Sequence, residues 1–165
     1  MSSSDLIASF QSARHDHDRC RRDALRVALQ VCEQRDARLT PLRRRVLELI
    51  WDSHRPVLAY ELLEAMQAES GRTAPPTVYR ALEFLIAQGL VHRIESLNAF
   101  VGCGRPDDSH SGQFLICTDC RAVAELNDGE IGELIRSKAI SAGFEVAAQT
   151  IEITGTCPDC RPQDS

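Results

Sequence analysis

Residues 75–103, with the sequence PPTVYRALEFLIAQGLVHRIESLNAFVGC, decide the class of fold. Apolar residues in the first half recur at the spacing of one helix face, at Val78, Leu82, Leu85 and Ile86. After Gly89 the apolar residues alternate instead, so the runs LVHRIES and NAFVGC predict two strands around a turn at Leu97 and Asn98. A helix that leads directly into a hairpin is typical of a winged helix-turn-helix, a DNA-binding fold.

Further helices are predicted upstream of this segment. Apolar residues share one face of a helix over about residues 19–36. Thr40 and Pro41 provide an N-cap and a proline at the first helical position, so a second helix begins there and continues to about residue 54. Residues 59–70, AYELLEAMQAES, form a third short helix. Short helices followed by a hairpin agree with the winged-helix prediction.

The composition is that of a globular protein. Of 165 residues, 43% are apolar and 26% are charged, which argues against a disordered chain, a collagen or a coiled coil. No apolar run approaches the ~18 residues that a membrane-spanning helix needs. The first residues contain no apolar core long enough for a signal peptide. We therefore expect a cytoplasmic protein with no membrane partner.

The second half of the chain predicts a small α+β domain. Residues 104–112 are polar and suit a linker. Two strands follow, QFLIC and AVAEL, and then a helix from about Asp128 to Ala142 and a long strand over residues 144–155. The fold class is therefore α+β, with a small α+β domain behind a winged-helix domain.

The domain boundaries follow from these elements. We expect the winged-helix DNA-binding domain over residues 1–92, with residues 1–18 as an N-terminal extension. A hinge and linker over residues 93–110 contain the end of the wing, and the α+β domain occupies residues 111–165. A domain this small buries little surface on folding, so it is usually reinforced by a metal, by disulfides or by association.

The cysteines offer that reinforcement. Seven cysteines are many for a cytosolic chain, where disulfides are rare and clustered thiols more often bind metal. Two CxxC turns, CTDC and CPDC, bring four of them: Cys117, Cys120, Cys157 and Cys160. Four thiolates make a closed tetrahedral site that suits structural zinc. The alternatives are unligated thiols or a redox CPDC, but redox CPxC motifs begin a helix near the start of a thioredoxin fold.

The start of the helix after Pro75-Pro76 carries the candidate DNA contacts. Thr77, Tyr79 and Arg80 fall in or near its first turn, the part of a recognition helix that meets base edges. Arginine binds guanine through two hydrogen bonds, and Thr77 and Tyr79 suit phosphates or a thymine methyl. An ordinary amphipathic helix is the alternative interpretation.

A looser set of potential ligands lies around the predicted junction of the domains. These residues are His92, Cys103, His110 and Glu125. Sulfur, nitrogen and oxygen donors together suit zinc. No short spacing rule joins them, so the residues alone favour ordinary solvated side chains.

The chain resembles the Fur family of metal-dependent repressors. The resemblance covers about residues 20–160 and follows the family's order of landmarks: RLTPLRRRVLELI, AYELLEAM, PPTVYRALEFLIAQGLVHRIES, FLICTDCRAVAEL and CPDC. It is strongest to the family's regulators of zinc uptake. A winged-helix DNA-binding domain, a hinge and a C-terminal dimerisation domain are what this resemblance implies.

The resemblance also implies roles for the candidate site residues. The four cysteines of the CxxC turns would hold structural zinc, and the set of His92, Cys103, His110 and Glu125 would hold regulatory zinc, giving two zinc ions per chain. Tyr60 and Arg80 match residues directed at operator bases, while Arg43 and Arg44 are further candidate DNA contacts. We expect a homodimer that binds a double-stranded operator and takes no small-molecule substrate.

Zinc is the expected signal because the pattern departs from the family's other sensors. Iron, manganese and peroxide sensors carry an HHDH-like run where this chain has DDSHSGQF, residues 107–114, with His110 alone. A cysteine at 103 also suits zinc better than iron or manganese. We therefore expect a zinc-responsive repressor of zinc uptake genes, bound as a dimer to pseudo-palindromic operators, and not an enzyme.

Two alternatives remain open from sequence. The nearer one is a regulator of the same family that responds to iron, manganese or peroxide; the farther one is a zinc or thiol enzyme. Four protein ligands leave no open position on a catalytic zinc, which disfavours the enzyme. The roles of Cys20, Cys32, His15 and His17 are not assigned, and Glu64 and Gln67 stand where some relatives use an Asp–Arg contact between dimers.

Overall fold

The computed structural model describes residues 6–8, 10, 16–53, 55–106 and 112–162. The chain forms two compact units. The first, here called the winged-helix unit, comprises Gln11–Asp108, and the second, the sheet unit, comprises Met1–Phe10 together with Ser109–Ser165. Both ends of the chain thus belong to one unit, a division that the sequence prediction did not contain.

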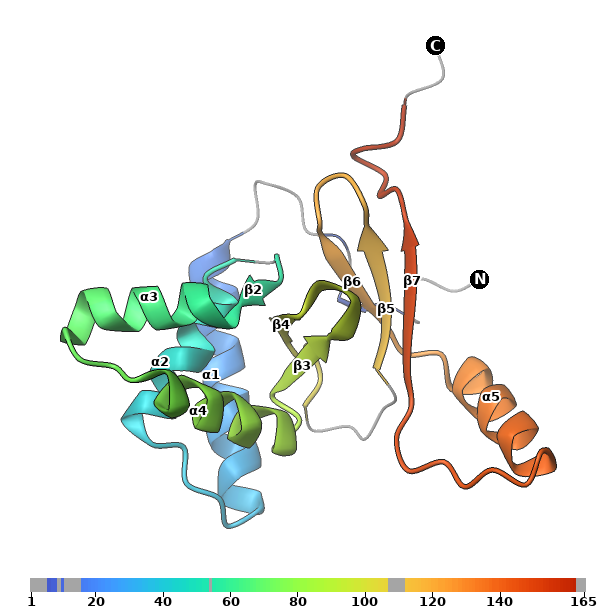
Figure 1. The fold of residues 1–165 in the computed structure, drawn as a ribbon, viewed down its shortest axis with the longest axis horizontal. Coiled ribbons are helices and arrows are strands. Elements are labelled where there is room, and N and C mark those ends of the chain that lie inside the picture. The colour runs from blue at the N-terminus through green and yellow to red at the C-terminus, as the bar shows by residue number, and fades with distance from the viewer. Residues whose placement is uncertain (1–5, 9, 11–15, 54, 107–111, 163–165) are drawn as a thin grey trace. The chain divides into compact units, whose positions relative to one another are not determined.

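Within its described residues, the winged-helix unit contains four α-helices, one short 3-10 helix and a three-stranded sheet (Figure 1). Its elements in chain order are α1 (His17–Gln34), α2 (Pro41–Trp51), β2 (Val57–Leu58), α3 (Ala59–Ser70), α4 (Pro75–Ala87), β3 (Val91–Ile94), the one-turn helix η1 (Glu95–Leu97) and β4 (Ala99–Gly102). The strands are antiparallel in the order β2-β4-β3. The predicted helices and hairpin are confirmed, while the two-residue β2 is too short to leave a pattern in the sequence.

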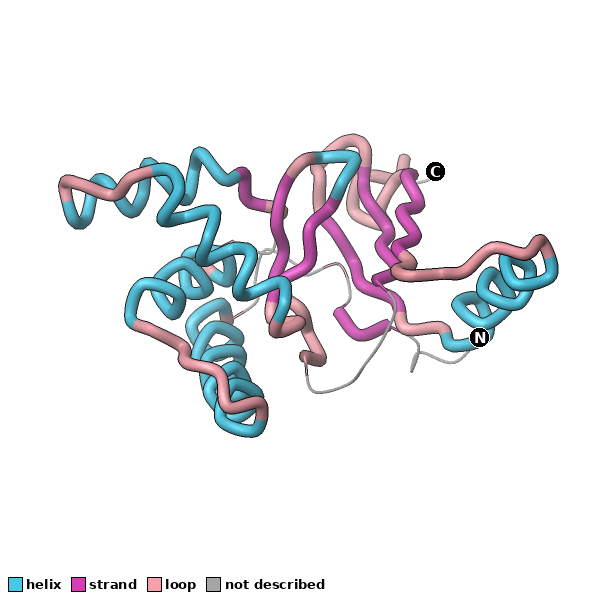
Figure 2. The backbone as a smooth tube through the Cα atoms, turned by 60° about the horizontal axis from the view of Figure 1, so that its bottom comes forward, coloured by secondary structure: helices cyan, strands magenta, loops and turns pink. Residues whose placement is uncertain are grey.

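Local chemistry sets the ends of these elements. The Thr40 hydroxyl accepts a hydrogen bond from the Arg43 amide at the start of α2, with Pro41 at the first helical position. The hairpin of β3 and β4, which forms the wing, turns at Asn98. The φ of Asn98 is 47°, a left-handed conformation that asparagine tolerates. In Figure 2, η1 joins the two strands of the wing at this turn. The predicted turn at Leu97 and Asn98 is therefore confirmed.

One apolar core holds the winged-helix unit together. It draws on the inward faces of all four helices and on the wing, with fully buried members that include Val46, Leu47, Ile50, Leu62, Leu82, Leu85 and Val91. Burial of each such side chain contributes ~1.5–3 kcal/mol relative to exposure. The outward face of α4 is left free of this core.

The sheet unit has four strands and one helix. Its elements are β1 (Leu6–Ala8), β5 (Gly112–Cys117), β6 (Val123–Leu126), α5 (Gly129–Ser141) and β7 (Thr150–Gly155). The strand order is β1-β6-β5-β7, with β5 and β7 parallel and the other pairs antiparallel. The crossover through α5 is what a parallel pair requires.

Two features of the sheet unit differ from the sequence prediction. The long strand expected over residues 144–155 begins only at Thr150, because its ladder with β5 starts at the pair Gly112–Thr150. Residues 1–18 were expected to extend the winged-helix domain, yet Leu6–Ala8 pairs with the edge of β6 as β1. Three residues carry no periodicity, so no sequence pattern could indicate this strand.

The helix α5 and strand β7 expose apolar side chains. All residues of α5 are described, and none of them is buried. The exposed apolar residues of this region are Ile131, Leu134, Ile135, Ile140, Phe144 and Ile153. A monomeric soluble domain rarely leaves such a group uncovered, so it marks a contact surface. Within the described residues, no helix has the length and apolar character needed to cross a membrane.

Candidate metal centres and nucleic-acid interface

Four cysteines meet at one end of the sheet unit. Cys117 ends β5, Cys120 lies in the turn that follows, and Cys157 and Cys160 follow β7. Parallel strands end at the same edge of a sheet, and the last pair of the β5–β7 ladder joins Cys117 to Gly155. The four sulfur atoms all lie within 4.8 Å of one another. The structure thus brings together the four cysteines that the sequence predicted as one group.

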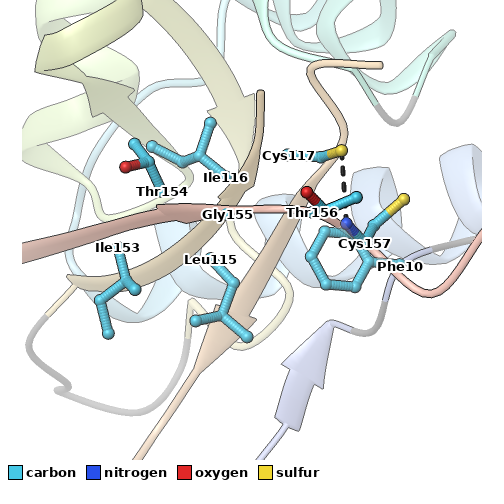
Figure 3. A pocket seen from close by; sticks show the side chains of 9 residues that line it. All are labelled: Phe10, Leu115, Ile116, Cys117, Ile153, Thr154, Gly155, Thr156 and Cys157. Carbon is cyan, nitrogen blue, oxygen red and sulfur yellow. Dashed lines mark hydrogen bonds between the residues drawn. The ribbon is translucent and has the colours of Figure 1, made fainter. Parts of the chain in front are cut away.

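Backbone amides stabilise a thiolate in this group. The amide of Cys157 donates to Cys117 Sγ at 3.4 Å (Figure 3). Amide donation from Cys120 and Cys157 lowers the pKa of the Cys117 thiol to about 6. Hydrogen bonds with the side chains of Cys157 and Cys120 raise the pKa of Cys160 to about 12. Metal binding requires thiolates, so a divalent cation bound here would displace the remaining thiol protons.

The donor set fits zinc as a structural ion. Cys117 and Cys157 are buried, and Cys120 and Cys160 are half-buried. Four thiolates at such spacing complete a tetrahedral zinc shell and leave no position for a substrate. The site would fasten the turn after β5 to the turn after β7, so it would close the sheet unit at one end.

An apolar pocket of about 120 Å³ lies beside the cysteines. It is lined by Phe10, Leu115, Ile116, Cys117, Ile153, Thr154, Gly155, Thr156 and Cys157 (Figure 3). Two of these lining residues, Cys117 and Cys157, belong to the four-cysteine group, so the pocket adjoins that group directly.

Two of the four expected regulatory ligands lie together on the wing. His92 is in β3 and Cys103 directly follows β4, and a ring nitrogen of His92 lies within 4.8 Å of Cys103 Sγ. The amide of Cys103 donates to the carbonyl of Leu90 at 3.0 Å, which extends the hairpin by one pair. Cys103 is buried, and His92 is half-buried.

The other two expected ligands are Glu125 and His110. Glu125 lies in β6 of the sheet unit, where it pairs with Phe114 of β5, and it is only 3% exposed. A carboxylate buried to this extent needs a partner to be stable. His110 lies outside the described residues.

The exposed face of α4 carries three candidate DNA contacts. Thr77, Tyr79 and Arg80 lie in the first half of this helix, and the side chain of Tyr79 is 53% exposed. Tyr60, at the second position of α3, is 58% exposed. Both tyrosine side chains are open to solvent, as a contact with DNA requires.

The two arginines at the start of α2 have partners inside the protein. Arg43 stacks on the ring of Phe84, with its guanidinium carbon 3.6 Å from the ring centre, and donates to the carbonyl of Arg38 at 2.7 Å. Arg44 pairs with Glu48 at 3.0 Å. These side chains would have to leave these partners to bind a phosphate.

The sequence matches the ferric uptake regulator family over residues 34–154. The chain belongs to the Fur family. The zinc uptake regulation protein of Escherichia coli (strain K12) is 37% identical over 139 residues, which are 84% of this chain and 81% of that protein.

Two solved structures are similar over the same range. A zinc uptake regulator complexed with zinc and DNA is 37% identical and has a TM-score of 0.81 over 85% of this chain and 94% of that chain. Holo XcZur is 45% identical, with a TM-score of 0.78 over 84% of this chain and 96% of that chain. The α+β fold with a winged-helix domain and a dimerisation domain is therefore the Fur-family fold, as predicted.

One contact within the winged-helix unit was not predicted from the sequence. Arg35, just after α1, donates to the carbonyls of Gln88 and Pro106. It therefore holds the segment that follows Cys103 against the end of α4. A single arginine after a helix gives no signal in the sequence, because its partners are backbone carbonyls far along the chain.

Proposed function

We propose that this Fur-family protein is a zinc-responsive DNA-binding repressor of zinc uptake genes. The observation that carries the proposal is that the donor atoms of His92 and Cys103 lie close together on the wing of the DNA-binding unit. A sulfur and a nitrogen donor placed there would make the DNA-binding unit itself sensitive to zinc. The zinc uptake regulators among its relatives support the same conclusion.

The four-cysteine group has a structural role in this proposal. Cys117, Cys120, Cys157 and Cys160 would hold one zinc ion per chain and stabilise the sheet unit. Zinc binding to such sites contributes ~10–16 kcal/mol in peptides, which is enough to decide whether a small unit folds.

The second site would hold the regulatory zinc. We assign it to His92, Cys103, Glu125 and His110, which supply one sulfur, two nitrogens and one oxygen. The first two belong to the winged-helix unit, while Glu125 belongs to the sheet unit. A ligand that binds the DNA-binding conformation more tightly than the other by roughly 5.5 kcal/mol shifts the protein almost completely to that conformation. Because such coupling is reciprocal, operator DNA must in turn increase the affinity for the regulatory zinc.

The protein would act as a homodimer. The apolar side chains on α5 and β7 have no cover within the described sheet unit, and a second copy of the same surface would bury them. A two-fold dimer presents two copies of α4 to half-sites about 34–36 Å apart on a pseudo-palindromic operator.

The DNA contacts are proposed for the exposed face of α3 and α4. Arg80 would bind a guanine, Tyr60 and Tyr79 would touch bases or phosphates, and Thr77 would bind a phosphate near the start of α4. Arg43 and Arg44 have weaker support because of their internal partners.

Zinc, rather than iron, manganese or peroxide, is favoured by a specific residue. Cys103 lies beside His92, and a thiolate ligand selects zinc over the harder cations. We propose no catalytic role, since a site with four protein ligands is closed to substrate. Such a regulator would work in the bacterial cytoplasm, where the DNA is.

The decisive experiment is operator binding by fluorescence anisotropy at buffered free zinc, with iron and manganese as controls. We expect binding to an AT-rich palindrome, and not to a scrambled duplex, to rise with zinc. Cys103→Ser should abolish the zinc response while leaving a folded dimer with one zinc per chain. Equal binding at all zinc concentrations, or a response only to iron or manganese, would refute the proposal.

A further inference from the structure

The two faces of the wing have different roles. In the β3–β4 ladder His92 pairs with Val101 and Val91 pairs with Gly102. Side chains alternate along a strand and paired residues share a face, so His92, Val101 and Cys103 project from one face. Val91 and Gly102 project from the other face, and Val91 belongs to the apolar core. The ligand-bearing face thus has the core directly behind it.

The residue before Cys103, Gly102, lies against the indole ring of Trp51. A Cβ atom placed on Gly102 would lie 2.3 Å from Cε2, 2.4 Å from Nε1 and 2.6 Å from Cζ2 of Trp51. These distances are far below van der Waals contact, so the indole occupies the space that any side chain at 102 would need. Glycine is required there because the ring and the backbone of β4 touch.

The ring belongs to a rigid part of the unit. Trp51 is the last residue of α2 and packs against the apolar core. The next residue, Asp52, pairs with Arg21 of α1. The ring thus lies at the end of α2, which this ion pair joins to α1, and from there it can hold β4 at a defined position.

We propose that Trp51 is a positioning residue for the zinc site on the wing. It acts through Gly102, the residue before Cys103, by setting where β4 lies relative to β3 and hence the separation of the His92 and Cys103 donors. This inference rests on the proposed regulatory site. Supporting residues behind metal ligands typically change metal affinity ~10–100-fold when they are replaced.

The test is zinc affinity of the full-length protein, measured by chelator competition after the four-cysteine site is filled. We expect Trp51→Leu to weaken the Cys103-dependent zinc by ~10-fold or more. Gly102→Ala should also weaken it, since its methyl group displaces the same ring. Trp51→Phe, which keeps a flat ring, should retain more affinity than Trp51→Leu.

The matched control is Phe84→Leu. It removes another partly buried ring of the same core, one that lies under Arg43 rather than opposite Gly102. We expect this variant to stay within about threefold of wild type, the scale of coupling between independent sites. Cobalt in place of zinc adds a readout that general destabilisation would not give, because thiolate-to-cobalt absorption at the second site should shift in Trp51→Leu and not in Phe84→Leu.

The fluorescence of Trp51 also reports on the zinc site of the wing, because Trp51 is the one tryptophan in the sequence. Its emission in the wild type should change as the second zinc ion binds, and Cys103→Ser should remove that change.

Equal zinc affinity in wild type and Trp51→Leu, or equal weakening of zinc binding in Phe84→Leu, would overturn the positioning role while leaving the regulatory site intact. A wild type with no Cys103-dependent zinc would overturn the site and the inference together. If Trp51→Leu does not fold, the zinc affinities of Gly102→Ala and Trp51→Phe test the positioning role instead.

Discussion

At the scale of single residues, we expect side chains on α4 to read the base sequence of the proposed operator. Arg80 is exposed in the first half of α4, beside the exposed Tyr79. A bidentate arginine–guanine contact discriminates against the wrong base by ~1–3 kcal/mol. We expect Arg80→Ala to lose preference at one operator position and to bind other positions as before. A set of single-base operator variants measures this, with Arg72→Ala, an exposed arginine before α4, as the control for charge. A uniform loss across all operators would make Arg80 a phosphate contact instead.

At the scale of elements, the ends of β5 and β7 depend on the sulfur group that joins them. Cys157→Ser removes one sulfur ligand and leaves the other three without a complete zinc shell. We expect the sheet unit to unfold or lose its partner subunit, while the helices of the winged-helix unit keep their circular dichroism. Zinc content and hydrogen exchange across residues 112–162 check this. Cys32→Ser, in the buried face of α1 and outside the metal group, is the matched control. A normal dimer with full zinc content would contradict the structural role.

The sequence predicted the elements whose signal is local and missed those that depend on distant partners. Helical spacing of apolar residues before Gly89 and their alternation after it were enough to predict α4 and the wing, and two CxxC turns were enough to predict the four-sulfur group. The start of β7 could not be predicted, because it is set by where β5 offers a partner, at Gly112. The contact of Trp51 with Gly102 was missed for the same reason: it joins a helix to a strand about fifty positions later, and neither residue is distinctive by itself.

At the scale of the whole molecule, association should depend on α5. Ile135 is exposed on the same side of this helix as Ile131 and Leu134, and a second copy would bury it. We expect Ile135→Glu to give a folded monomer that binds the operator weakly at any zinc concentration. Analytical ultracentrifugation measures the association. Arg136→Glu reverses a charge on the opposite side of α5 and should remain dimeric. A dimeric Ile135→Glu protein would place the interface elsewhere.

The pairing of β1 with β6 has a consequence for how the chain is made. Leu6 pairs with Leu126, so β1 finds its partner only after the whole winged-helix unit has been synthesised. The winged-helix unit, whose contacts lie within residues 11–108, can fold while β1 still waits. Completion of the sheet is therefore a late event in biosynthesis. A tag fused before β1 would therefore be attached to a strand that stays unpaired until β6 has been made, while the DNA-binding unit would not depend on that strand.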